Sequence, residues 1–356
     1  MSEEAVVAGS VEFAKRLLGV LNDGALALML SIGHRTGLFD AMAALPPSTS
    51  AQIAHAAKRD ERYVREWLAA MTTGRIVDYD SQLLTFSLPA DRAAWLTRAA
   101  GPANLALQTQ YVGLLALVED QIVDCFRNGG GVPYSAYPRF QALMAEDSGA
   151  VHDATLIDVI LPLVPGLIER LGQGIDVADI GCGSGHAVNL MAESYPASRF
   201  VGVDIADIGL AAGMAEAKRK GLTNVRFLNQ DAATLDGSEQ YDFITTFDAV
   251  HDQVRPDLVL SGIANSLPPG GRYLCVDIAA SSDVAGNRDH PLGPFMYTVS
   301  CMHCMTVSLA AGGMGLGAMW GEQRACQMLT DAGFTSVDVK HVDGDVFHAY
   351  YVATKA

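Results

Sequence analysis

The chain has 356 residues, of which 50% are hydrophobic, and a formal net charge of −16. A chain of this length can bury the cores of two domains. The acidic balance, −4 for residues 1–150 and −12 for residues 151–356, argues against a nucleic-acid partner, because phosphate binding needs a basic surface. The six cysteines are scattered along the chain, which indicates that they are reduced thiols and not a disulfide framework. The acidic start MSEEAVVAGS lacks the features of a secretory signal. We therefore expect a cytoplasmic protein.

The first predicted elements form a small helical unit. A helix is expected over residues 25–42 and a second over residues 50–58, separated by the turn LPPST. Asp60 occupies the N-cap position of a third helix, in which apolar residues recur at helical spacing. Two short strands are expected at residues 75–79 and 83–87. Three helices followed by a two-stranded wing predict a winged-helix module.

A winged helix raises the question of DNA binding. The basic side chains near the third helix outnumber the acidic ones there by only two. Since a fold alone does not establish a function, we expect this module to serve packing or dimerisation, with DNA binding as the alternative.

More helices are expected at residues 103–126, 136–146 and 153–171. The first two flank the loop RNGGGVPYSAYP, whose glycines and prolines disfavour regular structure. We place the domain boundary near residue 148, between the second and third of these helices. A winged-helix dimerisation and substrate-lid domain is then expected over residues 1–147 and a second domain over residues 148–356.

The second domain alternates apolar runs with helical patterns, which predicts a parallel α/β sheet. The runs are DVADIG, RFVGVDI, VRFLNQD, YDFITTF, GRYLCVDIA, SVDVKHV and FHAYYVATK. Only the short segment DGDV separates the last two, so we expect the last strand to be antiparallel.

The stretch VADIGCGSGHAVNL places a glycine-rich turn between a strand and a helix. The free N–H groups at such a helix start attract anionic groups. The dinucleotide fingerprint needs a glycine where His186 stands, and the phosphate P-loop needs Gly-Lys-Ser/Thr, so both are excluded.

The observed spacing, Asp-x-Gly-x-Gly-x-Gly, suits a ligand with an amino-acid end and a nucleoside end. Asp179 is placed at the strand tip for an ammonium group, and Asp204, at the tip of the next strand, for ribose hydroxyls. Asp231 and Ala232, after the third strand, are placed for adenine.

These segments resemble the class I S-adenosylmethionine-dependent methyltransferases. Five motifs follow that family's order: VADIGCGSG, FVGVDI, NVRFLNQDAATL, YDFITTFDAVHD and LPPGGRYLCVDI. The resemblance implies S-adenosylmethionine as cofactor and an α/β, Rossmann-like sheet of seven strands in the order 3-2-1-4-5-7-6, with strand 7 antiparallel. The cofactor-binding residues that it implies are Asp179, Gly181, Cys182, Gly183, Gly185, Asp204, Ile205, Asp231, Ala232 and Phe247.

The stretch TTFDAVHDQVRP, together with the winged helix, is similar to small-molecule O-methyltransferases. That match implies His251 as the general base for an acceptor hydroxyl and Asp277 as its orienting acid, with Asp252 as a second candidate. An imidazole titrates near 6.5 and can accept a proton at cytoplasmic pH. Two features depart from the subfamily: Met319 stands where a second acid is usual, with Glu322 three positions on, and the usual Trp after His-Asp is absent. The alternative is a structural histidine at a helix start.

Residues 291–321 contain no Asp, Glu, Lys or Arg, but Pro294 and several glycines interrupt them. We therefore expect a buried helix and a glycine loop, not a membrane span. In the resembling fold this segment forms a substrate lid, so it is expected to line an apolar pocket. The acceptor-binding candidates are Phe295, Met302, His303 and Trp320. The motif CMHC lacks a second ligand pair, so no metal site is predicted.

Together these features predict an enzyme that transfers a methyl group from S-adenosylmethionine to a small apolar or aromatic acceptor, at oxygen. Orientation and desolvation in a dry pocket supply much of the acceleration for such a transfer. We expect a homodimer with no nucleic-acid or membrane partner. Two alternatives remain open: a cofactor-sensing winged-helix transcriptional regulator, and a methyltransferase that acts on nitrogen, carbon or a protein.

Overall fold

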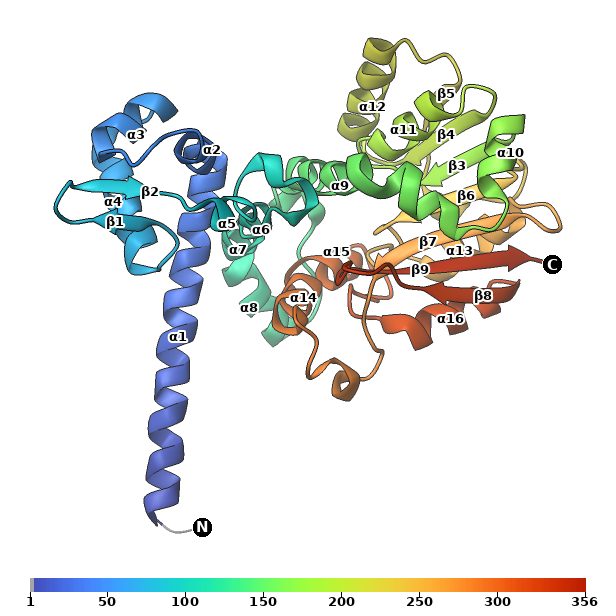
Figure 1. Ribbon diagram of the computed structural model, residues 1–356. Coiled ribbons are helices and arrows are strands. Elements are labelled where there is room, and N and C mark those ends of the chain that lie inside the picture. Colours follow the sequence, from blue (N-terminus) through green and yellow to red (C-terminus); the bar gives the residue numbers. More distant parts are fainter. Residues whose placement is uncertain (1–2) are drawn as a thin grey trace. The chain divides into compact units, whose positions relative to one another are not determined.

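The computed structural model describes residues 3–356, so the first two residues of the predicted N-terminal domain lie outside it (Figure 1). The chain divides into two compact units, one ending at Ala116 and the other beginning at Leu117. This division comes earlier than the predicted boundary at residue 147, because the segment after Leu117 packs within the second unit. The backbone N–H of Val132, for example, donates a hydrogen bond to Thr306 Oγ1 at 2.8 Å.

The first unit is a winged helix, as predicted, but its first helix begins at Glu3, well before the start expected at residue 25. Its elements are α1 (Glu3–Thr36), α2 (Leu38–Ala43), α3 (Ser50–Ala57), α4 (Glu61–Thr73), β1 (Asp78–Asp80), β2 (Thr85–Ser87), α5 (Ala90–Ala93), a 3₁₀ turn (Arg98–Ala103), α6 (Leu105–Gln108) and α7 (Gln110–Leu115). The Asp60 carboxylate caps α4 by accepting hydrogen bonds from the N–H groups of Arg62 and Tyr63. β1 and β2 pair antiparallel and form the wing.

Three predicted elements of this region differ in the structure. The helix expected at 25–42 breaks at Gly37, whose φ of 73° lies in the left-handed region. The first wing strand begins only at Asp78, because the N–H groups of Ile76 and Val77 bond to the carbonyl of Met71 at the end of α4. The helix expected at 103–126 is instead a series of short helices that ends with α8 (Glu119–Asn128).

The second unit contains the seven-stranded sheet. Its helices are α8, α9 (Phe140–Thr155), α10 (Leu167–Gln173), α11 (His186–Ser194), α12 (Asp207–Lys220), α13 (Pro256–Asn265), α14 (Gly293–Val299), α15 (Met305–Ala310) and α16 (Gly321–Asp331). Its strands are β3 (Asp176–Ile180), β4 (Arg199–Asp204), β5 (Val225–Asn229), β6 (Phe243–Phe247), β7 (Arg272–Ile278), β8 (Phe334–Lys340) and β9 (His348–Lys355). Short 3₁₀ turns lie at Ala116–Val118, Tyr134–Ala136, Leu161–Leu163, Ala232–Thr234 and Val284–Asn287.

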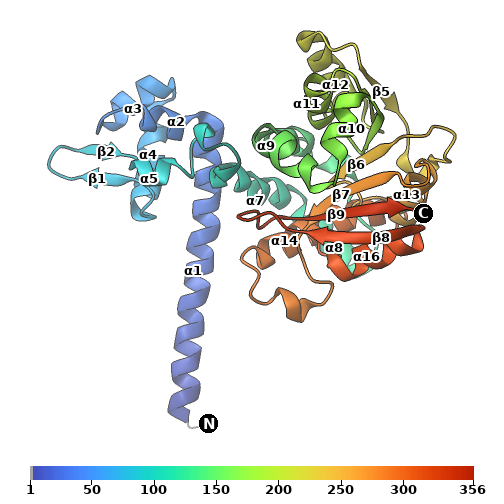
Figure 2. The same cartoon turned by 45° about the vertical axis from the view of Figure 1, so that its right-hand side comes forward.

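The sheet order is β5-β4-β3-β6-β7-β9-β8, which is the predicted order 3-2-1-4-5-7-6. β9 runs antiparallel to both of its neighbours, as the sequence predicts. Helices α10 and α11 lie on one face of the sheet, and α13 and α16 lie on the other (Figure 2). Their apolar side chains form the two cores that sandwich the sheet. The carboxyl ends of β3, β4, β6 and β7 therefore meet at one edge, where open α/β sheets bind ligands.

The helices that precede β3 differ from the predicted ones. The segments expected at 136–146 and 153–171 are joined, because α9 continues through Thr155 into a π-helical turn at Leu156–Ile160. The break comes at Gly166, which has a φ of 74°. In the segment 291–321, α14, a π-helical turn at Ser300–Cys304 and α15 precede a glycine-rich loop, as expected.

Among the described residues, one helix is long and apolar enough to cross a membrane, judged by length and composition alone. It is the Gly9–Thr36 part of α1, which has a mean hydropathy of 1.4. A bent pair, Phe140–Leu163 and Leu167–Gln173, passes the same test only when its two helices are taken together. The core helix of a soluble protein can meet this criterion, so it is weak support for a membrane span.

Candidate active site

The glycine-rich turn after β3 has little space for side chains. Gly181, Gly183 and Gly185 have φ values of 73°, 53° and 69°. A Cβ atom on Gly181 would lie 2.5 Å from the Cβ of Ala249, and one on Gly185 would lie 2.4 Å from the Phe227 ring. All three glycines suit the left-handed backbone, and Gly181 and Gly185 are also required by close packing against neighbouring elements.

The Asp204 carboxylate organises the turn from the end of β4. Its Oδ2 accepts the N–H of Gly183 at 2.8 Å, and its Oδ1 accepts the N–H of Ala206 at 2.8 Å. Each carboxylate oxygen can accept more than one hydrogen bond, so both retain capacity for a ligand hydroxyl. Asp231 similarly caps the 3₁₀ turn after β5 through the N–H of Ala233, at 2.9 Å, and Ala232 is buried beside it.

The Asp179 side chain lies deeper than the sequence suggests. It is 1% exposed, and its Oδ1 accepts a hydrogen bond from Thr245 Oγ1 at 2.8 Å. Burial, opposed in part by the Thr245 hydrogen bond, raises the Asp179 pKa to about 7. This carboxyl therefore connects β3 to β6 within the core.

His251 and Asp277 form a buried pair at the same edge of the sheet. His251 lies in the loop after β6, and its Nδ1 is 2.7 Å from Oδ1 of Asp277, near the end of β7. The same carboxylate oxygen accepts the N–H of Ile278 at 2.8 Å and the indole N–H of Trp320 at 3.1 Å. The expected contact between His251 and Asp277 is thus present.

The surroundings of His251 favour its protonated form. Burial alone would lower the His251 pKa, but Asp277 and Cys304 outweigh it and hold that pKa well above 6.5. The Cys304 thiol lies beside the imidazole. Burial raises the pKa of the neighbouring Asp252 to about 6, although His251 opposes the rise. Nothing in the sequence pattern pointed to Cys304 as a partner of the base.

An aromatic cluster adjoins this pair. His303 is fully buried and stacks on Phe140, with ring centroids 3.5 Å apart and an interplanar angle of 9°. The rings of Tyr134 and Tyr137 meet it edge-on. Neither ring nitrogen of His303 has a hydrogen-bond partner among the described residues, and burial lowers the His303 pKa to about 3. His303 is therefore a neutral imidazole in an apolar setting.

The other acceptor-binding candidates have different surroundings. Phe295 packs against a small core formed by the inserted segment, and the Met302 carbonyl accepts a hydrogen bond from the Tyr137 hydroxyl. Trp320 is buried and donates to Asp277, so it supports the His251 pair. Met319 is buried, and Glu322 pairs with His341 at 3.2 Å. Glu322 thus does not stand in for the missing second acid.

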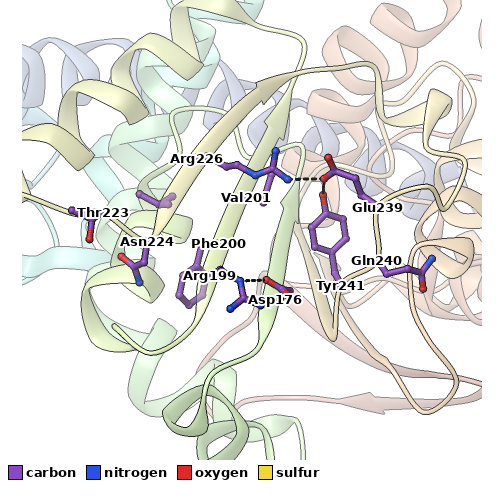
Figure 3. A pocket seen from close by; sticks show the side chains of 11 residues that line it. Asp176, Arg199, Phe200, Val201, Thr223, Asn224, Arg226, Glu239, Gln240 and Tyr241 are labelled. Atoms are coloured by element: carbon purple, nitrogen blue, oxygen red, sulfur yellow. Dashed lines mark hydrogen bonds and ion pairs between the residues drawn. The ribbon is translucent and has the colours of Figure 1, made fainter.

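A separate hollow lies at the opposite edge, where β3, β4 and β5 begin (Figure 3). Its charged side chains neutralise one another: Arg199 pairs with Asp176 at 2.5 Å, and Arg226 pairs with Glu239 at 2.7 Å. None of the predicted site residues lines this hollow.

Two family models match the chain. Residues 24–98 match the Rv2258c-like winged HTH domain, and residues 171–333 match a methyltransferase domain. The chain is a methyltransferase with an N-terminal winged-helix domain. The fold and family predicted from the sequence are thereby confirmed, and the methyl donor of this class is S-adenosylmethionine, as the sequence predicts. No curated protein sequence matches this methyltransferase.

Solved structures share the fold across both units. The structure of human N-acetylserotonin methyltransferase is 17% identical, with a TM-score of 0.69, 96% of this chain covered and 97% of that one. The mitomycin 7-O-methyltransferase MmcR is 16% identical, with a TM-score of 0.71 and coverages of 99% and 100%. A putative O-methyltransferase from Nostoc punctiforme is 16% identical, with a TM-score of 0.69 and full coverage of both chains.

Proposed function

We propose that this methyltransferase moves the methyl group of S-adenosylmethionine to a hydroxyl oxygen of a small acceptor, with His251 as general base. The buried 2.7 Å contact between His251 Nδ1 and Asp277 Oδ1 carries this proposal. A carboxylate on Nδ1 fixes the orientation of the ring, so Nε2 is the nitrogen that takes the acceptor's proton. Asp252 lies beside the pair and adds negative potential there.

The turn after β3 fits a nucleoside bearing an amino acid. S-adenosylmethionine supplies a methyl group on a positively charged sulfur. In this chain Asp204 is assigned to the ribose hydroxyls, while Asp231 and the backbone of Ala232 are assigned to adenine. The Ile205 side chain, 69% exposed at the end of β4, offers an apolar surface to the purine ring. The floor of this site is assigned to Phe247 and to the turn from Gly181 to Gly185, which includes Cys182.

The acceptor is assigned as uncharged and apolar or aromatic. The inserted segment that carries His303 and Cys304 has no Asp, Glu, Lys or Arg between residues 291 and 321. Its neighbours Tyr134, Tyr137 and Phe140 add aromatic surface. Such walls exclude water from the transferred methyl group and orient the acceptor. Phe295 and Met302 contribute to the same apolar wall.

The winged helix is assigned to dimerisation and not to DNA. On α4, Arg62 pairs with Glu66 at 2.6 Å and Arg65 pairs with Glu61 at 3.0 Å. These pairs neutralise the basic groups that phosphate contacts would need.

We assign the protein to the cytoplasm, since its six cysteines are free thiols.

Two measurements test the proposal. Calorimetry with S-adenosylhomocysteine should show binding, and Asp204→Ala should weaken it strongly. A screen with methyl-labelled S-adenosylmethionine should then favour neutral phenols over amines, thiols and proteins. An absence of heat would overturn the cofactor assignment. Transfer only to nitrogen, carbon or protein acceptors would overturn the acceptor assignment, and salt-sensitive duplex binding without transfer would favour a regulator.

A further inference from the structure

Two buried polar atoms lack hydrogen-bond partners at the carboxyl edge of the sheet. Asp248 follows β6 directly, and its Oδ1 has no partner among residues 3–356. His152, on α9, is 8% exposed, and its Nδ1 has no partner there either. The His152 ring meets the ring of Phe247, the residue before Asp248, edge-on with centroids 4.7 Å apart. Unpartnered buried polar atoms cost free energy, so a pair of them in one place points to a ligand.

The backbone at Asp248 is also strained. Its φ of 50° is left-handed, which is uncommon for a residue other than glycine. The conformation is held by its own N–H, which donates to the Val276 carbonyl at 3.0 Å. Strain of this kind persists where surrounding structure enforces it, often at binding sites.

A charged histidine holds the other oxygen of Asp248. His348, at the start of β9, lies 3.2 Å from Asp248 Oδ2 through Nε2 and 3.1 Å from Asp345 Oδ2 through Nδ1. Burial would lower the His348 pKa, but the two carboxylates hold it well above 6.5. Burial would raise the Asp248 pKa, but His348 keeps it below its ordinary value. Asp248 is therefore an oriented carboxylate with one free oxygen.

His152 offers the complementary group. Burial, with a further contribution from His186, lowers the His152 pKa to about 4, so the ring is neutral at physiological pH. A neutral imidazole has one N–H donor and one acceptor nitrogen. An ammonium and a carboxylate on one ligand would thus find an acceptor at Asp248 and a donor at His152.

The position of this pair matches the expected path of the cofactor. β3 and β6 are neighbours from which the chain continues to opposite sides of the sheet, so the crevice between their ends is the switch point where such sheets bind ligands. The turn at Gly181 touches Ala249, the residue after Asp248. Asp179, which the sequence suggests for the ammonium, already accepts a hydrogen bond from Thr245 in the core.

We propose that Asp248 and His152 bind the amino-acid end of S-adenosylmethionine, with Asp248 Oδ1 accepting from the ammonium and His152 Nδ1–H donating to the carboxylate. This assignment rests on the proposed function. It moves recognition of the charged end from Asp179 to Asp248, which lies within the stretch YDFITTFDAVHD but was given no role from the sequence, and to His152, which lies in no motif. The competing interpretation is a purely structural network of His348, Asp248 and Asp345.

The two interpretations are separated by comparing two nucleosides on the full chain. S-adenosylhomocysteine has the amino-acid end, and 5′-methylthioadenosine lacks it. Asp248→Asn and His152→Phe should each weaken S-adenosylhomocysteine about tenfold or more, as loss of a charge-assisted hydrogen bond predicts, and leave methylthioadenosine unchanged. His152→Gln, which restores an N–H, should recover part of the loss.

Asp158→Asn is the matched control, since this exposed residue lies in the π-helical turn that follows α9. It should change neither affinity. Equal weakening of both nucleosides, or no weakening of either, in variants with wild-type circular dichroism would overturn the assignment. Failure of the wild-type chain to bind either nucleoside would overturn the proposed function instead.

Discussion

Oδ1 of Asp277 accepts three hydrogen bonds at once, and the shortest, at 2.7 Å, joins it to Nδ1 of His251. The other two donors are the backbone of Ile278 and the indole of Trp320, which fix the carboxylate from β7 and from the residue before α16. Oδ2 of Asp277 is buried with no partner among the described residues. The imidazole is therefore positioned by a rigid group, and only its Nε2 is left for chemistry.

Removal of the imidazole is the most direct test of the base. His251→Ala should lower kcat roughly 10²- to 10⁴-fold, the usual contribution of general-base catalysis. The affinity for S-adenosylhomocysteine should stay nearly unchanged, because the turn that holds the cofactor does not include His251. His55→Ala, on the exposed face of α3, is the control and should retain full activity. Loss of cofactor binding in His251→Ala would show that the residue is structural.

The rate of methyl transfer should rise with pH. The neutral imidazole accepts the proton, and the His251 pKa lies well above 6.5, so most of the base is protonated below that pKa. The logarithm of kcat/KM should increase as the pH rises through the His251 pKa and then level off. Asp277→Asn removes the main group that raises this pKa, so the midpoint should move to lower pH while the plateau falls. A profile independent of pH between 6 and 9 would contradict the proposed base.

Cys304 should tune the same profile. Its thiol raises the His251 pKa, so Cys304→Ala should shift the midpoint of kcat/KM against pH downwards, and Cys304→Ser, which keeps a hydrogen-bonding group, should shift it less. Neither change should alter the affinity for S-adenosylhomocysteine. Cys326→Ala is the control, because that half-buried thiol lies on α16 and its charged neighbour is Glu322. Identical profiles for all three variants would show that the thiol does not act on the base.

The sequence predicted the sheet and the positions of the residues at its carboxyl edge well because both follow from local patterns. Alternating apolar runs define the strands, and the short DGDV connection identifies β9 as antiparallel. The tips of β3, β4 and β5 follow directly from where those runs end, which is why Asp204 and Asp231 could be placed. The contact between His251 and Asp277 required only that β6 and β7 be neighbours.

What the sequence missed depends on contacts between distant segments. Asp179 is one residue from the glycine turn, yet its side chain is buried against Thr245 of β6. His152 belongs to a helix whose sequence carries no motif, and Cys304 faces the base because a π-helical turn shapes the segment around it. The wing strand β1 begins late because the end of α4 captures two N–H groups, which no propensity of residues 75–77 reveals.

Gly181 should be required for stability as well as for binding. Gly181→Ala would have to adopt a φ of 73° and would place a Cβ atom 2.5 Å from that of Ala249. We expect a loss of about 2–4 kcal/mol in the free energy of unfolding, from backbone strain plus the clash. Gly166→Ala has nearly the same φ, 74°, with open space around it, so it should lose only about 1 kcal/mol. Urea unfolding of both variants measures the difference, and equal losses would show that the contact with Ala249 is not limiting.

The exposed apolar face of α1 should hold two chains together. One side of this helix carries exposed apolar residues at helical spacing. They are Leu17 (53% exposed), Leu21 (69%), Leu28 (44%) and Ile32 (43%). A contiguous apolar stripe of this length marks an interface, and we expect a homodimer by light scattering. The double variant Leu17→Glu with Leu21→Glu should give a monomer, because two buried carboxylates at the interface would cost more than the contact contributes. Val284→Glu, at a site that is 67% exposed in the second unit, is the matched control and should leave the mass unchanged. A monomeric wild-type chain would contradict the assignment of the winged helix to dimerisation.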